Sequence, residues 1–326
     1  MQSTRKWRWG VHRWWVLLFI ILNVVAVSVV APVRPNIQVA PEKVIETPLF
    51  TLPILGDFYL FNTLIATLFV DLIIVGIAWN VRRALQSGSL IPAGISGVLE
   101  AGIEILYNLT ESSAGKQAKR IFPWFATIMI LVMVMNMIKL IPGFETIGIL
   151  RPEEEGHPAQ LWFGKVYILL PGQAAEGEEA FGLIPFLRGP TTDLNFTLAL
   201  ALISVLMTQV IGVQVQGAAY FLKFFNVTQL FKKPFFGAMD FLVGLLELIS
   251  EFAKILSFAF RLFGNMFAGI VLVALVGSLL PVFLPSFIFL FELFIGLIQA
   301  FVFGMLTMVF MAQATRGHSS EEHGAE

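Results

Sequence analysis

Long apolar stretches separated by polar segments run along most of the chain. A helix needs about 20 apolar residues to cross a bilayer core of roughly 30 Å. Four stretches have about this length, at 14–32, 57–79, 121–142 and 194–216. Two longer apolar stretches follow, at about 238–277 and 283–312. The pattern predicts an all-α integral membrane protein, with several transmembrane helices and a C-terminal hairpin of two long helices.

The first long stretch, 238–277, exceeds what an upright membrane helix needs. As a helix it would extend about 60 Å, which is about twice the bilayer core. We therefore expect the long helices to be strongly tilted or to lie along the membrane plane. Residues 91–110 are too mixed in character to span, and we expect them to lie along the membrane surface.

Polar residues within 238–277 gather on one side of the predicted helix. At 100° per residue they fall within a stripe about 80° wide. The stripe consists of Asp240, Glu247, Glu251, Lys254, Arg261 and Asn265. Small residues run beside it, namely Ser250, Ser257, Gly264 and Ala268. Because small residues let another helix approach closely in lipid, this face combines a polar track with a docking surface.

Two simpler explanations of the stripe stay open. It could be a solvated face, although its flanks are too apolar for open water. Glu247, Glu251 and Lys254 could also form a local ion-pair cluster, since residues three or four apart touch on a helix. Arg261 cannot join such a cluster, because its neighbours at these spacings carry no carboxylate. A buried cation without a partner is costly, so we expect its counter-ion on another helix or another chain.

The last apolar stretch carries Glu292 and Gln299, which are seven residues apart and therefore share one helix face. Gln299 could simply form an interhelical hydrogen bond. Glu292 lies in the middle of the stretch, where a carboxylate indicates an ion pathway or a proton relay.

Composition supports a membrane protein and excludes several other classes. The 326 residues are 57% hydrophobic and 13% charged, against roughly 25% charged in soluble domains. A net charge of −1 gives no basic surface for nucleic acid. The chain has no Cys, which excludes disulfides and thiolate metal sites. It also lacks a phosphate-binding G-x-x-x-x-G-K-[ST] loop, so we expect no nucleotide site, cofactor or metal in this chain.

Lysine and arginine positions predict the orientation in the membrane. If the N-terminus is cytoplasmic, 13 of the 21 lie on that side and five lie outside. Because positive residues concentrate in cytoplasmic loops, we expect both termini to be cytoplasmic and 143–192 to be an outer loop. The first residues resemble a signal peptide, but Pro32 after Ala31 is a poor cleavage context. We therefore interpret 1–35 as a retained extra anchor that precedes a domain at 36–326.

Three motifs resemble subunit a of the rotary F-type ATP synthase membrane sector. They are "RLFGNMFAG" (261–269), "GLIQAFVFGMLTMVF" (296–310) and "PTTDLNFTLALAL" (190–202), in the order of that family. The resemblance implies a stator that moves protons, or sodium ions in some members, past a rotating ring of c subunits. It also implies peripheral-stalk b subunits, the remaining complex and lipid as partners, and an energy-coupling membrane, here expected to be the bacterial plasma membrane.

The resemblance also assigns roles to particular residues. Arg261 matches the essential arginine that faces the ring carboxylate, and Asn265 and Gln299 match its polar partners. Glu292 and Asp193 match positions of the outer half-channel. The positions of the inner half-channel are matched by Glu247, Ser250 and Ser257, with Glu251 and Lys254 beside them.

One position departs from the family pattern. Many members carry Glu or His where this chain has Ile270, so we expect Glu292 to carry more of the outer path. Asp193 could act only as a helix N-cap, because it follows two threonines at the start of an apolar stretch. Lys139 is expected to extend toward the outer interface. A secondary transporter with a buried arginine site, and a purely structural anchor, are the alternative functions.

Overall fold

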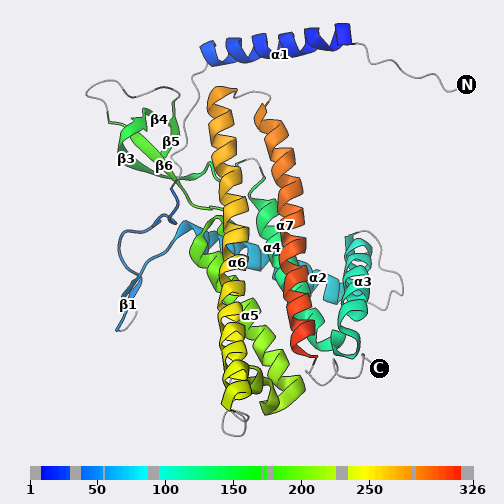
Figure 1. Cartoon of the computed structure of the whole chain (residues 1–326). Coiled ribbons are helices and arrows are strands. Elements are labelled where there is room, and N and C mark those ends of the chain that lie inside the picture. The colour runs from blue at the N-terminus through cyan, green and yellow to red at the C-terminus, as the bar shows by residue number, and fades with distance from the viewer. Residues whose placement is uncertain are drawn as a thin grey trace, which may run out of the picture.

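Four helices form the centre of the fold: two form the predicted C-terminal hairpin and two pack against it. They are α4 (Ala118–Ile138), α5 (Leu194–Gln216), α6 (Pro234–Leu279) and α7 (Leu284–Ala314). In the computed structural model, α6 and α7 run side by side as a long antiparallel pair (Figure 1). The hairpin of two long helices is therefore confirmed, and α6 even begins earlier than expected. The described residues are 9–316 without 30–37, 54–55, 87–94, 142, 171, 173, 175–178, 225–233 and 281–283.

The apolar core lies where these four helices meet. Phe258 and Leu262 of α6 pack with Phe303 of α7, and the rings of Phe258 and Phe303 lie 5.0 Å apart. Close contact between α4 and α7 depends on Gly304 of α7, because a Cβ at this position would lie 2.8 Å from Cβ of Met129 on α4. Core packing thus holds one face of α6 and leaves its other face free.

Three further helices precede this core. They are α1 (Trp9–Val29), α2 (Asn62–Gln86) and α3 (Ile95–Ala114). A short 3-10 turn at Gly115–Gln117 joins α3 to α4, and α3 packs against both α4 and α7. Residues 95–110 thus lie in a helix of the bundle, and residues 91–94 lie outside the described part; the position of 91–110 along the membrane surface stays a prediction. Figure 1 draws α1 apart from the bundle, and its described side chains are mostly exposed.

Five helical stretches are long and apolar enough to cross a membrane, by length and composition among the described residues. They are Asn62–Arg83, Gly97–Ile138, Leu194–Lys223, Phe241–Ser278 and Leu284–Ala314. These confirm the expected membrane protein of mainly helical fold. The expected span at 14–32 coincides with α1, of which Arg13–Ser28 is apolar but shorter, and residues 30–32 lie outside the described part.

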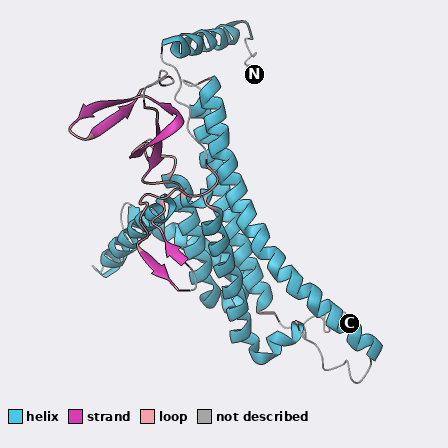
Figure 2. Ribbon diagram, turned by 90° about the vertical axis from the view of Figure 1, so that its left-hand side faces the viewer, coloured by secondary structure: helices cyan, strands magenta, loops and turns pink. Residues whose placement is uncertain are grey.

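Small antiparallel strand pairs add to the helices, and the apolar pattern did not predict them. The antiparallel pairs are β1 (Phe50–Leu52) with β2 (Gly56–Phe58), β3 (Gly148–His157) with β6 (Phe181–Pro185), and β4 (Ala159–Phe163) with β5 (Val166–Leu169). Gly164 turns the chain between β4 and β5 at a φ of 59°, which suits glycine. The expected outer loop is therefore partly folded. It lies at the same end of the bundle as the last turns of α6 and the first turns of α7 (Figures 1 and 2).

Candidate functional site

Arg261 lies on α6 between the core-facing side and the open side of the helix. Its helix neighbours Phe258 and Leu262 are buried in the core, whereas Phe260 is exposed. The guanidinium donates a 3.3 Å hydrogen bond to the hydroxyl of Ser257. Among the described residues it forms no ion pair with a carboxylate. We expected the counter-ion of Arg261 on another helix or another chain. The described residues of the other helices do not supply it.

Asn265 and Gln299 link the two long helices one turn beyond Arg261. Nδ2 of Asn265 donates a 2.7 Å hydrogen bond to Oε1 of Gln299. Gln299 is buried, and its Nε2 has no hydrogen-bond partner among the described residues. The interhelical hydrogen bond left open for Gln299 is therefore seen, while a role of both residues as partners of Arg261 stays a prediction. The bond leaves the buried Nε2 of Gln299 as a donor without a partner among the described residues.

The small residues beside the polar stripe form an open row on α6. Ser250, Ser257 and Ala268 are exposed. A Cβ added to Gly264 would meet no heavy atom of the described chain within 4 Å. None of the described helices covers this row, so a further helix can approach it closely.

A cluster of charges lies on the stripe toward the start of α6. Oε1 of Glu251 lies 3.1 Å from Nζ of Lys254 and 3.3 Å from Nζ of Lys223. Glu247 lies 3.7 Å from the same Lys223. The local ion-pair interpretation is thus correct for this part of the stripe, although it does not extend to Arg261. The side chain of Asp240 lies outside the described residues.

Lys223 is a site residue that sequence reasoning missed. It also donates a 2.8 Å hydrogen bond to the hydroxyl of Tyr220, which in turn donates to Gln209 at 2.7 Å. These residues lie around the end of α5, far from the stripe in sequence. A basic residue at the end of an apolar stretch was the only signal, and many such residues simply face the membrane surface.

Glu292 forms a buried ion pair with Lys139 near the other end of α6. Their charged atoms lie 3.6 Å apart, and the side chains are only 7% and 4% exposed. The expectation that Lys139 extends toward the interface is therefore wrong, because a buried carboxylate provides its partner. A Cβ on Gly269 of α6 would overlap the Glu292 carboxylate. Glycine at this position thus lets Glu292 of α7 reach α6, directly beside Ile270.

Asp193 caps α5 and also makes a second contact. Its Oδ1 accepts a 2.9 Å hydrogen bond from the backbone N–H of Asn195, as an N-cap does. Its Oδ2 accepts a 3.0 Å hydrogen bond from the hydroxyl of Thr63 on α2. The capping interpretation is correct, but it accounts for only one of the two oxygens.

The polar residues thus form three groups along the α6–α7 pair. One contains Glu292 with Lys139, one lies around Arg261, and one lies around Glu251, while Asp193 at the start of α5 contacts Thr63. No hydrogen bond or ion pair joins these groups to one another within the described part of the chain. Such an arrangement can carry ions from either end toward the arginine without forming one continuous path.

Comparisons with known proteins agree with the motifs. The family model described as ATP synthase A chain matches residues 63–312. ATP synthase subunit a of Moorella thermoacetica is 26% identical over 264 residues, covering 81% of this chain and 95% of that protein. ATP synthase subunit a 1 of Syntrophotalea carbinolica is 29% identical over 248 residues, covering 75% and 82%. The sodium ion specific subunit a of Propionigenium modestum is 29% identical over 250 residues, covering 76% and 72%.

The matched range runs from the start of α2 to the last turns of α7 and includes all three polar groups. The comparisons do not favour a secondary transporter. The chain therefore belongs to the ATP synthase A chain family and is an ion-translocating stator subunit of an F-type ATP synthase.

Proposed function

We propose that this chain forms two offset half-channels against a rotating ring of c subunits, and thereby couples proton flow to ATP synthesis. The observation that carries the proposal is Arg261, a permanent cation beside an open row of small residues, with no carboxylate partner in the described chain. A ring helix that carries a carboxylate fits both features at once.

The outer half-channel runs past Asp193 and Glu292. A proton that arrives there neutralises a ring carboxylate, which can then face lipid because a neutral carboxyl is far less costly in lipid than a charged one. The buried ion pair of Glu292 with Lys139 supports a polar route at this depth, since both charged groups lie away from the exposed surface.

The inner half-channel runs along the start of α6. It is lined by Glu247, Ser250, Ser257, Glu251 and Lys254. After nearly a full rotation, the ring carboxyl reaches this side and releases its proton. The carboxylates of Glu247 and Glu251, close to Lys223 and Lys254, support an aqueous and charged route here.

Arg261 separates the two half-channels. An adjacent cation favours the ionised form of a carboxyl group, so the protonated ring carboxyl gives up its proton to the inner half-channel as it approaches Arg261. A fixed cation also blocks a direct proton path, as it does in selective pores. Each charge that crosses the membrane releases about 2.3 kcal/mol per 100 mV, and this energy drives rotation only when protons cannot leak past the arginine.

The ring contact can be tested at Gly264. We expect Gly264→Leu to leave the subunit inserted and folded, because nothing in the described chain lies within 4 Å of the new Cβ. The added side chain would prevent close approach of the ring helix, so ATP-driven proton pumping in vesicles should be largely lost. Gly102→Leu on α3 is the matched control, since its Cβ is equally free. Normal pumping by Gly264→Leu would refute docking on this row.

We further propose that both termini face the cytoplasm of a bacterial plasma membrane and that residues 1–35 stay attached as an extra anchor. In support, 13 of the 21 lysines and arginines lie on the cytoplasmic side and five lie outside if the N-terminus is cytoplasmic. Mass spectrometry of the intact purified subunit should therefore show the complete chain. Loss of about the first 31 residues would show that the segment is a signal peptide with a cleavage site.

The transported ion in this proposal is the proton. Among the relatives, the subunit of Propionigenium modestum is named as sodium ion specific. Pumping by this enzyme should therefore continue in sodium-free medium. A strict requirement for added sodium would instead assign the sodium ion to this chain.

A further inference from the structure

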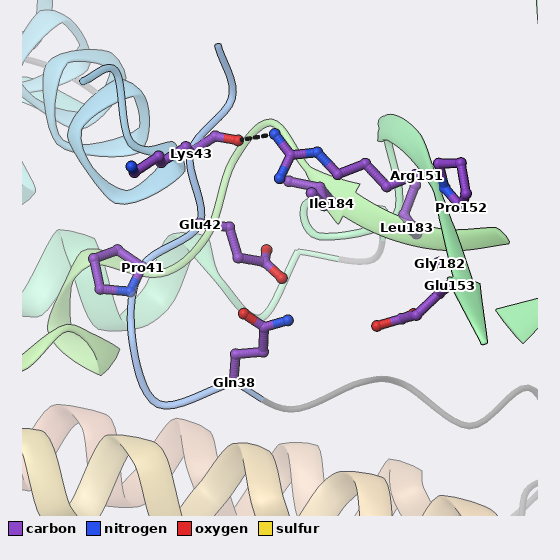
Figure 3. Close-up of a pocket in the computed structure, with 10 residues that line it drawn as sticks. All are labelled: Gln38, Pro41, Glu42, Lys43, Arg151, Pro152, Glu153, Gly182, Leu183 and Ile184. Atoms are coloured by element: carbon purple, nitrogen blue, oxygen red, sulfur yellow. Dashed lines mark hydrogen bonds between the residues drawn. The ribbon is translucent and has the colours of Figure 1, made fainter. Parts of the chain in front are cut away.

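A cavity of about 240 Å³ opens between residues 38–43 and the β3–β6 strand pair (Figure 3). Glu42 projects into the cavity from the segment 38–43, and Glu153 projects into it from β3 on the opposite side. Lys43 and Arg151 also line it, although the Lys43 ammonium packs over the Tyr59 ring, 3.5 Å from its centroid. The cavity is large enough to hold several water molecules. It lies at the end of the bundle where the expected outer loop folds.

Hydrogen bonds lead from Glu42 into the protein. Nδ2 of Asn62 donates to Oε2 of Glu42 at 3.1 Å, and the backbone N–H of Glu42 donates to Oδ1 of Asn62 at 3.3 Å. The same Oδ1 accepts a 2.9 Å hydrogen bond from the backbone N–H of Thr63. The Thr63 hydroxyl then donates to Asp193. A continuous series of polar contacts thus joins the cavity to the carboxylate already placed in the outer half-channel.

This series is buried, unlike an ordinary surface network. Asn62 is 0% exposed, Thr63 4% and Asp193 6%. Buried polar side chains require partners, and here each one finds its partner in the next member of the series. The amide of Asn62 does not ionise, so it can orient the Glu42 carboxylate but cannot exchange protons with it.

Two arginines hold the segment that carries Glu42. Arg188 donates to the carbonyl oxygens of Gln38 and Ala40, and Arg151 donates to that of Lys43 at 2.9 Å. The segment that carries Glu42 is thereby held in place by side chains of two distant parts of the chain.

The surroundings of Glu42 also tune its protonation. Burial raises the pKa of the Glu42 carboxyl above its ordinary value, and the nearby Glu153 adds to this rise. Arg188, Arg151 and the hydrogen bond from Asn62 act in the opposite direction on the same pKa. Because its pKa is raised, the Glu42 carboxyl takes up a proton at a higher pH than the carboxyl of a free glutamate does.

We propose that this cavity is the outer mouth of the ion path and that Glu42 collects protons there for Asp193. The inference rests on the proposed function and adds the entrance to it. A hydronium ion in the cavity gives its proton to the Glu42 carboxylate and leaves as water. Glu42 then releases the proton to water of the cavity, and the Asp193 carboxylate accepts it, while the buried contacts through Asn62 and Thr63 hold Glu42 and Asp193 on one route. In this series Glu42 exchanges the proton, and Asn62 is a positioning residue.

The test is ATP synthesis by the whole complex in liposomes, driven by an imposed pH gradient. The pH is varied on the side to which the outer half-channel opens, which is called the outer side below. We expect Glu42→Gln to lower the initial rate several-fold and to shift the rate profile to more acidic outer pH, because protons then reach Asp193 only from bulk water. Glu42→Asp, which keeps a carboxyl group, should recover much of the rate. Raising the concentration of a small buffer on the outer side should also rescue Glu42→Gln, since the buffer delivers protons in place of the lost carboxyl.

Glu46→Gln is the matched control. It removes the same charge from the same segment, but the Glu46 side chain is 82% exposed and pairs with Arg151 rather than Asn62. Its rate profile should equal that of the wild type. A Glu42→Gln profile equal to the wild type, or a reduced rate that neither buffer nor Glu42→Asp restores, would overturn the inference. If Glu42→Gln does not assemble, a Glu42→Asp rate that is lowered and rescued by buffer supports it, and any other Glu42→Asp result overturns it.

Failure of this inference would differ from failure of the proposed function. If the entrance lies elsewhere, Glu42→Gln behaves as the wild type while Arg261→Ala still abolishes coupled synthesis. If the proposed function itself is wrong, Arg261→Ala also retains coupled synthesis.

Discussion

Arg261→Ala should abolish ATP-driven proton pumping and make the membrane sector leak protons. Without the guanidinium, nothing favours the ionised ring carboxylate at the boundary, and no fixed cation blocks a path between the half-channels. Folding should persist, because the only hydrogen bond that Arg261 makes in the described chain goes to Ser257. Pumping is measured by dye quenching in vesicles, and the leak is measured in vesicles stripped of the catalytic sector.

Arg261→Lys sharpens this prediction. It keeps a positive charge, but a lysine ammonium is compact and can lose its proton more readily than a guanidinium. Coupled pumping should therefore still fail. Subunit content checked by gel separates loss of coupling from loss of assembly. Full assembly with normal pumping by Arg261→Ala would contradict both the role of the arginine and the half-channel proposal.

Glu292→Gln should strongly slow pumping while the complex still assembles. Glutamine has nearly the same shape but cannot exchange a proton, and it leaves Lys139 as a buried cation without its partner. The double variant Glu292→Gln with Lys139→Gln removes that unpaired charge. It should restore any lost assembly but not the rate, which separates a relay role from a purely structural one.

A carboxyl group introduced at position 270 should partly restore the outer path that Glu292→Gln impairs. Ile270 follows Gly269, which approaches the Glu292 carboxylate on the facing helix. Ile270→Glu in the Glu292→Gln background should place a carboxyl near the lost one and recover part of the pumping rate. Wild-type pumping by Glu292→Gln alone would show that the outer path runs elsewhere.

The helical part of the fold could be predicted from the apolar pattern. The stretch expected at 238–277 became α6 at Pro234–Leu279, and the one at 283–312 became α7 at Leu284–Ala314. Membrane helices are predictable in this way, because backbone groups in lipid must be satisfied within the segment. The interhelical hydrogen bond considered for Gln299 is seen between the two helices, with Asn265 as its partner.

Contacts between distant segments could not be predicted in the same way. Lys139 and Lys223 both lie at the end of an apolar stretch, where nothing local shows whether a lysine reaches the interface or a buried carboxylate. Only the packing of α4 against α7, and of α5 against α6, brings them to Glu292 and Glu251. The strand pairs were missed because β1, β2, β4, β5 and β6 have only three to five residues each, and because β3 pairs with β6 across the intervening β4–β5 pair.

Disulfide cross-linking tests most directly whether the open row of α6 faces the ring. Because the chain has no native Cys, single cysteines can be placed at Gly264 and Ala268, with Gly102→Cys as the control, each against a cysteine beside the carboxylate on the ring helix. The proposed arrangement predicts cross-links from Gly264→Cys and Ala268→Cys and none from Gly102→Cys. Cross-links to the ring from Gly102→Cys but not from the α6 row would contradict it.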